Sequence, residues 1–150
     1  MESGRSYVAL MENVSVSILK SLIEFTAPTN RLVTLLEAWI SQTVSETSTM
    51  ETAQIIRKTA VGTGTVFTAR PLAENAAAYG GTVRTDLTVE GTLGNIMHME
   101  GFNILNGWYY KPVPEARIWV APGGFLAVRF GVAPAAALTV SAGMIFAEVG

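Results

Sequence analysis

One histidine and a nearby glutamate have the residue types and spacing that could support proton transfer. In His98-Met99-Glu100 the two side chains are two positions apart, so on a β-strand they project from the same face. An imidazole beside a carboxylate can act as a general acid and base. The same spacing also occurs in side-chain pairs on solvated or interfacial strand faces, and we favour that interpretation.

The sequence does not support a metal site or a site that depends on cysteine. His98 is the only histidine and the chain has no cysteine, which excludes a multi-histidine metal centre of the cupin kind, thiolate zinc sites, disulfides and cysteine nucleophiles. The glycine pairs at 80–81 and 123–124 lack the phosphate-loop and dinucleotide-binding patterns, so we predict turns there. We predict no metal and no cofactor.

Hydrolytic arrangements are equally weak. Glu90 and Glu100 could meet across a cleft as the two carboxylates of a glycoside hydrolase, but nothing in their spacing supports this. The only aspartate, Asp86, falls beside Arg84 on a strand face that we expect to meet solvent, so no Ser-His-Asp set is formed. We therefore predict that the protein is not an enzyme.

The aromatic residues Trp108, Tyr109, Tyr110 and Trp119 suggest binding instead of catalysis. Three consecutive aromatic residues on a strand place rings on both faces, so at least one ring lies outside the core. An exposed ring suits a protein interface or a platform on which a sugar stacks. The alternative is a ring packed beneath a neighbouring loop.

The composition also favours contacts with other subunits. The chain of 150 residues is 49% hydrophobic and only 15% charged, whereas globular domains carry about 25% charged residues. Either part of the surface is covered by other subunits or the surface is rich in Ser, Thr, Asn and Gly, and we favour the first interpretation. The net charge of −2 provides no footprint for nucleic acid.

The apolar runs do not predict a membrane protein. Polar residues interrupt each run well short of the ~18 residues of a membrane-spanning helix. The first residues lack the basic start and apolar core of a signal peptide. We therefore expect no membrane partner.

Turn residues between apolar runs predict two hairpins. Pro122-Gly123-Gly124 separates two arms of residues 117–130 that are rich in β-branched and aromatic residues. Asn106-Gly107 separates residues 97–104, where Gly101 suggests a bulge, from the aromatic residues 108–110.

The remaining strands are predicted from alternation and from turn spacing. They cover residues 14–18, 22–27, 31–44, 52–59, 65–70, 82–90 and 138–149. A helix over 16–26 and a short helix within 31–44 remain alternatives, and 71–81 is a loop or a single helical turn. In 31–44, Val33, Leu35 and Trp39 share one face and Leu36, Ala38 and Ile40 the other.

About eight short strands without a helical period between them predict an all-β fold. We expect an antiparallel β-sandwich over residues 14–150 and favour a jelly roll. Residues 1–13 are predicted to be an N-terminal arm that lies across a neighbouring subunit, anchored by Tyr7, Val8, Leu10 and Met11.

The chain resembles the small jelly-roll head decoration, or cement, proteins of tailed bacteriophages. The stretches that carry the resemblance are residues 22–28, 41–48, 62–64, 100–103, 112–118 and 146–150. The resemblance implies a structural protein of the phage head surface, assembled in the host cytoplasm, that binds major capsid protein subunits without catalysis. It also implies self-association as a dimer or trimer.

The alternative function is a carbohydrate- or receptor-binding module of a virion on the same fold. Seven residues are candidates for the contacts: Tyr7, Leu10, Met11, Trp108, Tyr109, Tyr110 and Trp119.

Overall fold

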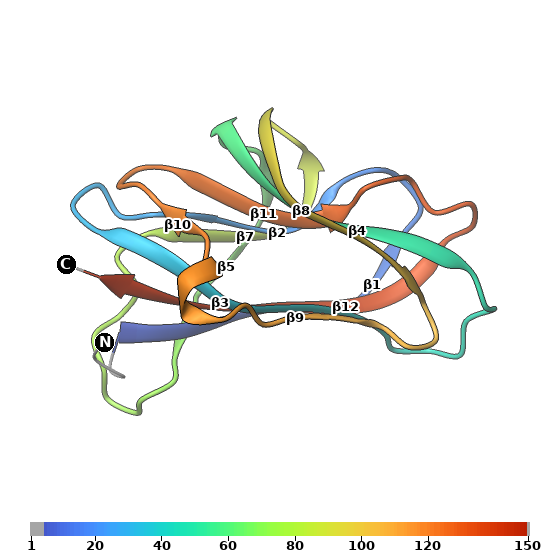
Figure 1. Cartoon of the computed structure of the whole chain (residues 1–150), viewed down its shortest axis with the longest axis horizontal. Coiled ribbons are helices and arrows are strands. Elements are labelled where there is room, and N and C mark those ends of the chain that lie inside the picture. The colour runs from blue at the N-terminus through green and yellow to red at the C-terminus, as the bar shows by residue number, and fades with distance from the viewer. Residues whose placement is uncertain (1–4, 150) are drawn as a thin grey trace.

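A computed structural model describes residues 5–149, which form two antiparallel β-sheets packed face to face (Figure 1). The predicted all-β sandwich is therefore confirmed. The strands are β1 (Ser6–Val16), β2 (Ser21–Thr26), β3 (Leu32–Gln42), β4 (Met50–Ala60), β5 (Thr63–Phe67), β6 (Arg70–Pro71), β7 (Thr82–Val89), β8 (Thr92–Asn103), β9 (Trp108–Tyr110), β10 (Trp119–Val120), β11 (Phe125–Phe130) and β12 (Leu138–Val149). Within residues 5–149 no helix is long and apolar enough to cross a membrane.

The strand order shows how the chain alternates between the sheets. The first sheet has the order β10-β3-β12-β1-β6, with β9 also paired to β3, and the second has the order β5-β7-β2-β11-β4-β8. In the described chain, every hydrogen-bonded pair joins strands that are not consecutive in sequence. This order is compatible with a jelly roll, in which two Greek keys interleave their strands.

The predicted hairpin around Pro122-Gly123-Gly124 is wrong, although the turn is present. Gly124 N–H donates to the carbonyl of Ala121 at 2.8 Å, and Gly123 has the positive φ, 75°, that this turn requires. However, β10 pairs with β3 in the first sheet, whereas β11 pairs with β2 and β4 in the second. The turn therefore carries the chain from one sheet to the other.

The predicted hairpin at Asn106-Gly107 is wrong for the same reason. Gly107 has φ 72° and donates its N–H to the carbonyl of Asn103 at 3.2 Å, but β8 pairs with β4 and β9 with β3. Turn residues decide where a chain reverses, whereas the burial of strand faces decides which strands pair. The bulge expected at Gly101 is also absent, because Gly101 pairs in register with Thr52, and the three register irregularities of β8 lie between Thr92 and His98.

Neither alternative helix forms. The segment 16–26 contains the last residue of β1 and all of β2, and the segment 31–44 contains β3. Residues 71–81 form a loop after a short strand. In β7 (Thr82–Val89), Val83 and Leu87 are buried and Val89 is exposed.

The N-terminal segment is a core strand, so the prediction of an arm on a neighbouring subunit is wrong from Ser6 onward. β1 pairs with β12 from Ser6 to Val16 and with β6 on its other side, and the two ends of the described chain lie together (Figure 1). Alternate residues Tyr7, Ala9 and Met11 are buried in the core, because the period of two directs them to the inner face. Residues 1–4 of the predicted arm lie outside the described residues.

A cluster of aromatic rings closes one end of the sandwich. Phe25 of β2 stacks on Phe146 of β12 with centroids 4.8 Å apart, and Tyr79 from the loop before β7 meets Phe146 edge-on at 4.9 Å. Tyr7 lies 5.3 Å from Tyr79 and donates its O–H to the carbonyl of Ala77 at 2.9 Å. Burial raises the pKa of Tyr7 to about 12.

Alkaline pH is expected to weaken the fold through Tyr7. A tyrosine in an unfolded chain has a pKa of about 10, whereas that of Tyr7 in the folded protein is about 12. Its stabilising effect is therefore complete below pH ~10 and lost as the pH rises through ~12. Urea unfolding should show a steeper loss of stability over this range for the wild type than for Tyr7→Phe, and equal slopes would contradict the expectation.

A second prediction distinguishes a core strand from an arm. Met11→Asp places an unpaired carboxylate in the core, so we expect the free energy of unfolding to fall by about 3 kcal/mol or more. Ser15→Asp, on an exposed position of the same strand, should change it by no more than ~0.5 kcal/mol. Chemical denaturation measures both. A Met11→Asp protein that is fully stable but fails to self-associate would restore the arm.

Candidate functional site

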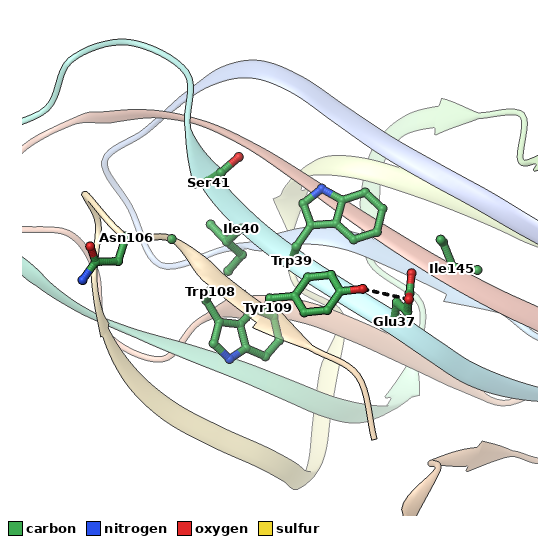
Figure 2. A pocket seen from close by; sticks show the side chains of 9 residues that line it. Glu37, Trp39, Ile40, Ser41, Asn106, Trp108, Tyr109 and Ile145 are labelled. Carbon is green, nitrogen blue, oxygen red and sulfur yellow. Dashed lines mark hydrogen bonds between the residues drawn. The ribbon is translucent and has the colours of Figure 1, made fainter. Parts of the chain in front are cut away.

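The outward face of the first sheet carries an open hollow of about 490 Å³ (Figure 2). Strands β3, β9 and β12 and the turn before β9 form it. Its lining combines aromatic, aliphatic and hydrogen-bonding side chains: Glu37, Trp39, Ile40, Ser41, Asn106, Gly107, Trp108, Tyr109 and Ile145. Ligand sites typically have volumes of about 300–1,000 Å³ and this mixture of apolar walls with a few polar groups.

Trp39 and Tyr109 in the lining of the hollow belong to a row of paired residues across four strands. Leu10 on β1 pairs with Gly143 on β12, Gly143 pairs with Trp39 on β3, and Trp39 pairs with Tyr109 on β9. A Cβ at Gly143 would lie 2.0 Å from Cζ2 of the Trp39 ring, so only glycine permits the indole to rest on the β12 backbone. The row therefore holds Trp39 directly against the sheet.

A β-bulge turns Trp39 outward. Between Leu35 and Glu37 the register of β3 with β12 shifts, which leaves Leu36 as an extra residue. The prediction that Trp39 shares a face with Val33 and Leu35 is therefore wrong, because the bulge reverses the alternation after Leu35. Ala38 and Ile40 point to the core, and Trp39 becomes part of the surface.

A carboxylate is held at one end of the aromatic row. Tyr109 donates its O–H to Oε1 of Glu37 at 2.7 Å, and Nζ of Lys111 lies 3.3 Å from the same oxygen. The hydrogen bond to Glu37 raises the pKa of Tyr109 above its ordinary value, so this hydroxyl stays protonated at neutral pH. Figure 2 shows Ser41 and Asn106 toward the opposite end of the row.

The seven residues predicted from the sequence for contacts divide between the core and the surface. Tyr109 is 58% exposed and Leu10 lies on the same outward row, but Tyr7, Met11 and Trp108 are buried, although Trp108 borders the hollow. Tyr110 is half-buried, and Trp119 is exposed on β10 outside the hollow. The buried three belong to inward positions of β1 and β9.

The sequence analysis did not identify Trp39 and Glu37 as candidate site residues. The signal was present, because Glu37, Trp39 and Ser41 alternate with the apolar Ala38 and Ile40. Apolar residues before position 37 concealed this alternation.

The pair His98 and Glu100 forms as expected, with Nε2 and Oε1 3.0 Å apart. Its surroundings are aromatic, since the imidazole centroid lies 4.7 Å from that of Tyr110 and 6.2 Å from that of Trp108. In the described chain no group of three or more potential metal-ligating side chains comes together.

The edge strand β8 is a second candidate surface. It is the last strand of the second sheet, and nearly all of its residues from Thr92 to Gly101 are exposed. Four large apolar side chains are exposed on it: Leu93, Ile96, Met97 and Met99. Natural sheets protect such edges with lysine, proline or β-bulges. β8 has no lysine or proline, but its register with β4 is irregular on both sides of Ile96.

A buried ion network lies around Lys58 on the second sheet. Nζ of Lys58 on β4 lies 2.6 Å from Oε2 of Glu24 on β2 and 2.9 Å from Oε2 of Glu90 after β7. Ser21 donates to Oε2 of Glu90 at 2.6 Å, and Arg129 donates to its Oε1 at 3.3 Å.

The network is a structural support. Oε1 of Glu24 accepts the backbone N–H of Gly62 at 3.1 Å, so all four carboxylate oxygens have partners within the protein. The bonds from Glu24 and Lys58 fasten the links β4–β5 and β7–β8 against the outer face of the second sheet.

Comparison with models of protein families, with curated proteins and with solved structures gave no match. The functional argument for this chain therefore depends on its own residues.

Two lysine–glutamate pairs test the structural role of the network. Lys58→Met leaves the buried carboxylates of Glu24 and Glu90 without their cation, which should lower the free energy of unfolding by ~3–5 kcal/mol. Lys111→Met breaks a pair in which the lysine is 66% exposed, and we expect a change below ~1 kcal/mol. Thermal and urea unfolding measure both, and similar losses for the two variants would refute the distinction.

Proposed function

We propose that this protein is a non-enzymatic structural component of a virion, a decoration or cement protein that binds neighbouring major capsid protein subunits on the head of a tailed phage. It self-associates as a dimer or trimer on the head surface. The observation that carries the proposal is the exposed apolar edge of β8.

The edge of β8 has the properties of a surface that another chain covers. Its outer backbone N–H and C=O groups have no strand beside them in the described sheet. The exposed side chains of Ile96, Met97 and Met99 lie next to that edge. A strand or loop of a partner would satisfy the backbone groups and remove these side chains from water.

The composition fits repeated assembly on a shell. Only 15% of the residues are charged, and exposed apolar residues are frequent for a chain of this size. Many copies that each make a modest contact reach high avidity on a repetitive surface. The resemblance to phage decoration proteins points to such a shell.

A second candidate function is a carbohydrate- or receptor-binding module of a virion. The hollow around Trp39 and Tyr109 favours it. Trp108, which we expected among the stacking platforms, is 3% exposed and cannot contribute its ring.

Two lysines introduced on β8 test the assembly proposal. The double variant Ile96→Lys/Met99→Lys should weaken self-association and binding to undecorated phage heads at least ~tenfold, because it protects the edge as natural edge strands do. The thermal midpoint should change little, since both side chains are already exposed. Sedimentation velocity and co-sedimentation with heads measure these effects.

The matched control is Val113→Lys/Val132→Lys, which adds the same charge at exposed positions away from β8. It should associate like the wild type. A wild-type protein that remains monomeric at high concentration and does not bind heads would reject the proposal.

A further inference from the structure

The hollow on the first sheet contains two aromatic rings, Trp39 and Tyr109, that neighbouring residues hold in place. Trp39 rests on the backbone at Gly143, where a Cβ would lie 2.0 Å from its ring. Tyr109 is its cross-strand partner and is held by the bond from its O–H to Glu37. Figure 2 shows the two rings side by side on the outward face. Little conformational entropy is therefore lost when a flat ligand settles on them.

Hydrogen-bonding groups stand at both ends of this platform. Glu37 lies at one end, and Ser41 and Asn106 lie toward the other. Glu37 and Ser41 are four residues apart on β3, a span of ~13 Å at about 3.3 Å per residue. A ligand that fills the hollow must be apolar on one face, polar along its rim and longer than a single small ring.

Saccharides have this chemistry. One face of a pyranose ring carries C–H groups that pack on an aromatic ring, whose face is electron-rich. Its rim carries hydroxyls, which both donate and accept hydrogen bonds. A carboxylate such as Glu37 accepts from two hydroxyls, and the amide of Asn106 can donate and accept.

The charge of the lining residues distinguishes neutral saccharides from acidic ones. None of the nine lining residues is a lysine or arginine. The nearby Lys111 is engaged by Glu37 at 3.3 Å. A sugar with its own carboxylate or sulfate would meet Glu37 without a free cation to compensate, so a neutral glycan is favoured.

We infer that the hollow of Trp39, Tyr109, Glu37, Ser41 and Asn106 binds a neutral oligosaccharide, with a pyranose ring stacked on the two aromatic side chains. The inference rests on the second candidate function, which it deepens by naming the ligand class. The site is separate from the surface used in the assembly proposal. It lies on a face of the first sheet, whereas the assembly proposal rests on the edge of the second.

The experiment is a screen on an array of neutral oligosaccharides (gluco-, manno-, galacto- and N-acetylglucosamine series) and uronic acid oligomers, followed by titration calorimetry. We expect binding to at least one neutral series and weaker binding to the uronic acids. Trp39→Ala should weaken that binding at least ~tenfold. Trp119→Ala, which removes an exposed tryptophan of the same sheet outside the hollow, should bind like the wild type.

Three results would overturn the inference. They are the absence of binding to every neutral series at millimolar concentration, unchanged binding by a folded Trp39→Ala variant, and a preference for the uronic acids. Loss of self-association in Trp39→Ala without glycan binding by the wild type would instead identify the hollow as a protein contact. Glycan binding retained by Ile96→Lys/Met99→Lys would separate this site from assembly through β8.

Discussion

Backbone pairing between strands that are distant in the chain is the constraint on which this structure depends. Across residues 5–149 no strand is hydrogen-bonded to the strand that precedes or follows it. β1 therefore needs β12 from the opposite end of the chain before its backbone groups are paired. Since loop closure opposes such contacts until many form together, the sandwich should fold slowly and as one unit. The same constraint makes β1 indispensable to the core.

The two outer faces of the sandwich are completed in different ways. On the second sheet, Lys58 joins Glu24 and Glu90, and this network fastens the links β4–β5 and β7–β8. On the first sheet the bulge at Leu36 brings Trp39 to the surface, and Gly143 leaves room for its ring. The outer face of the second sheet therefore carries buried ion pairs, whereas that of the first sheet carries an open aromatic hollow.

We propose two separate recognition surfaces, the edge of β8 and the hollow. Main-chain groups and apolar side chains on β8 suit another polypeptide. The ring pair and polar ends of the hollow suit a small, partly apolar ligand.

Local pattern alone determined much of this protein. The alternation of β7 and the apolar runs of β3, β11 and β12 predicted strands, and the turn residues Pro122 to Gly124 and Asn106-Gly107 predicted chain reversals, because both signals depend only on neighbouring residues. The spacing of His98 and Glu100 likewise placed them on one face.

Strand partners were decided only by the tertiary structure. The turns at Pro122 to Gly124 and at Asn106-Gly107 each connect two strands that belong to different sheets. Trp39 faces outward because β3 bulges against β12, and Tyr7 and Met11 are buried because β1 pairs inside its own sheet. The pairing of β1 with β12 joins residues more than 100 positions apart. Many strands share the same preference for burial, so this preference cannot specify which two strands pair.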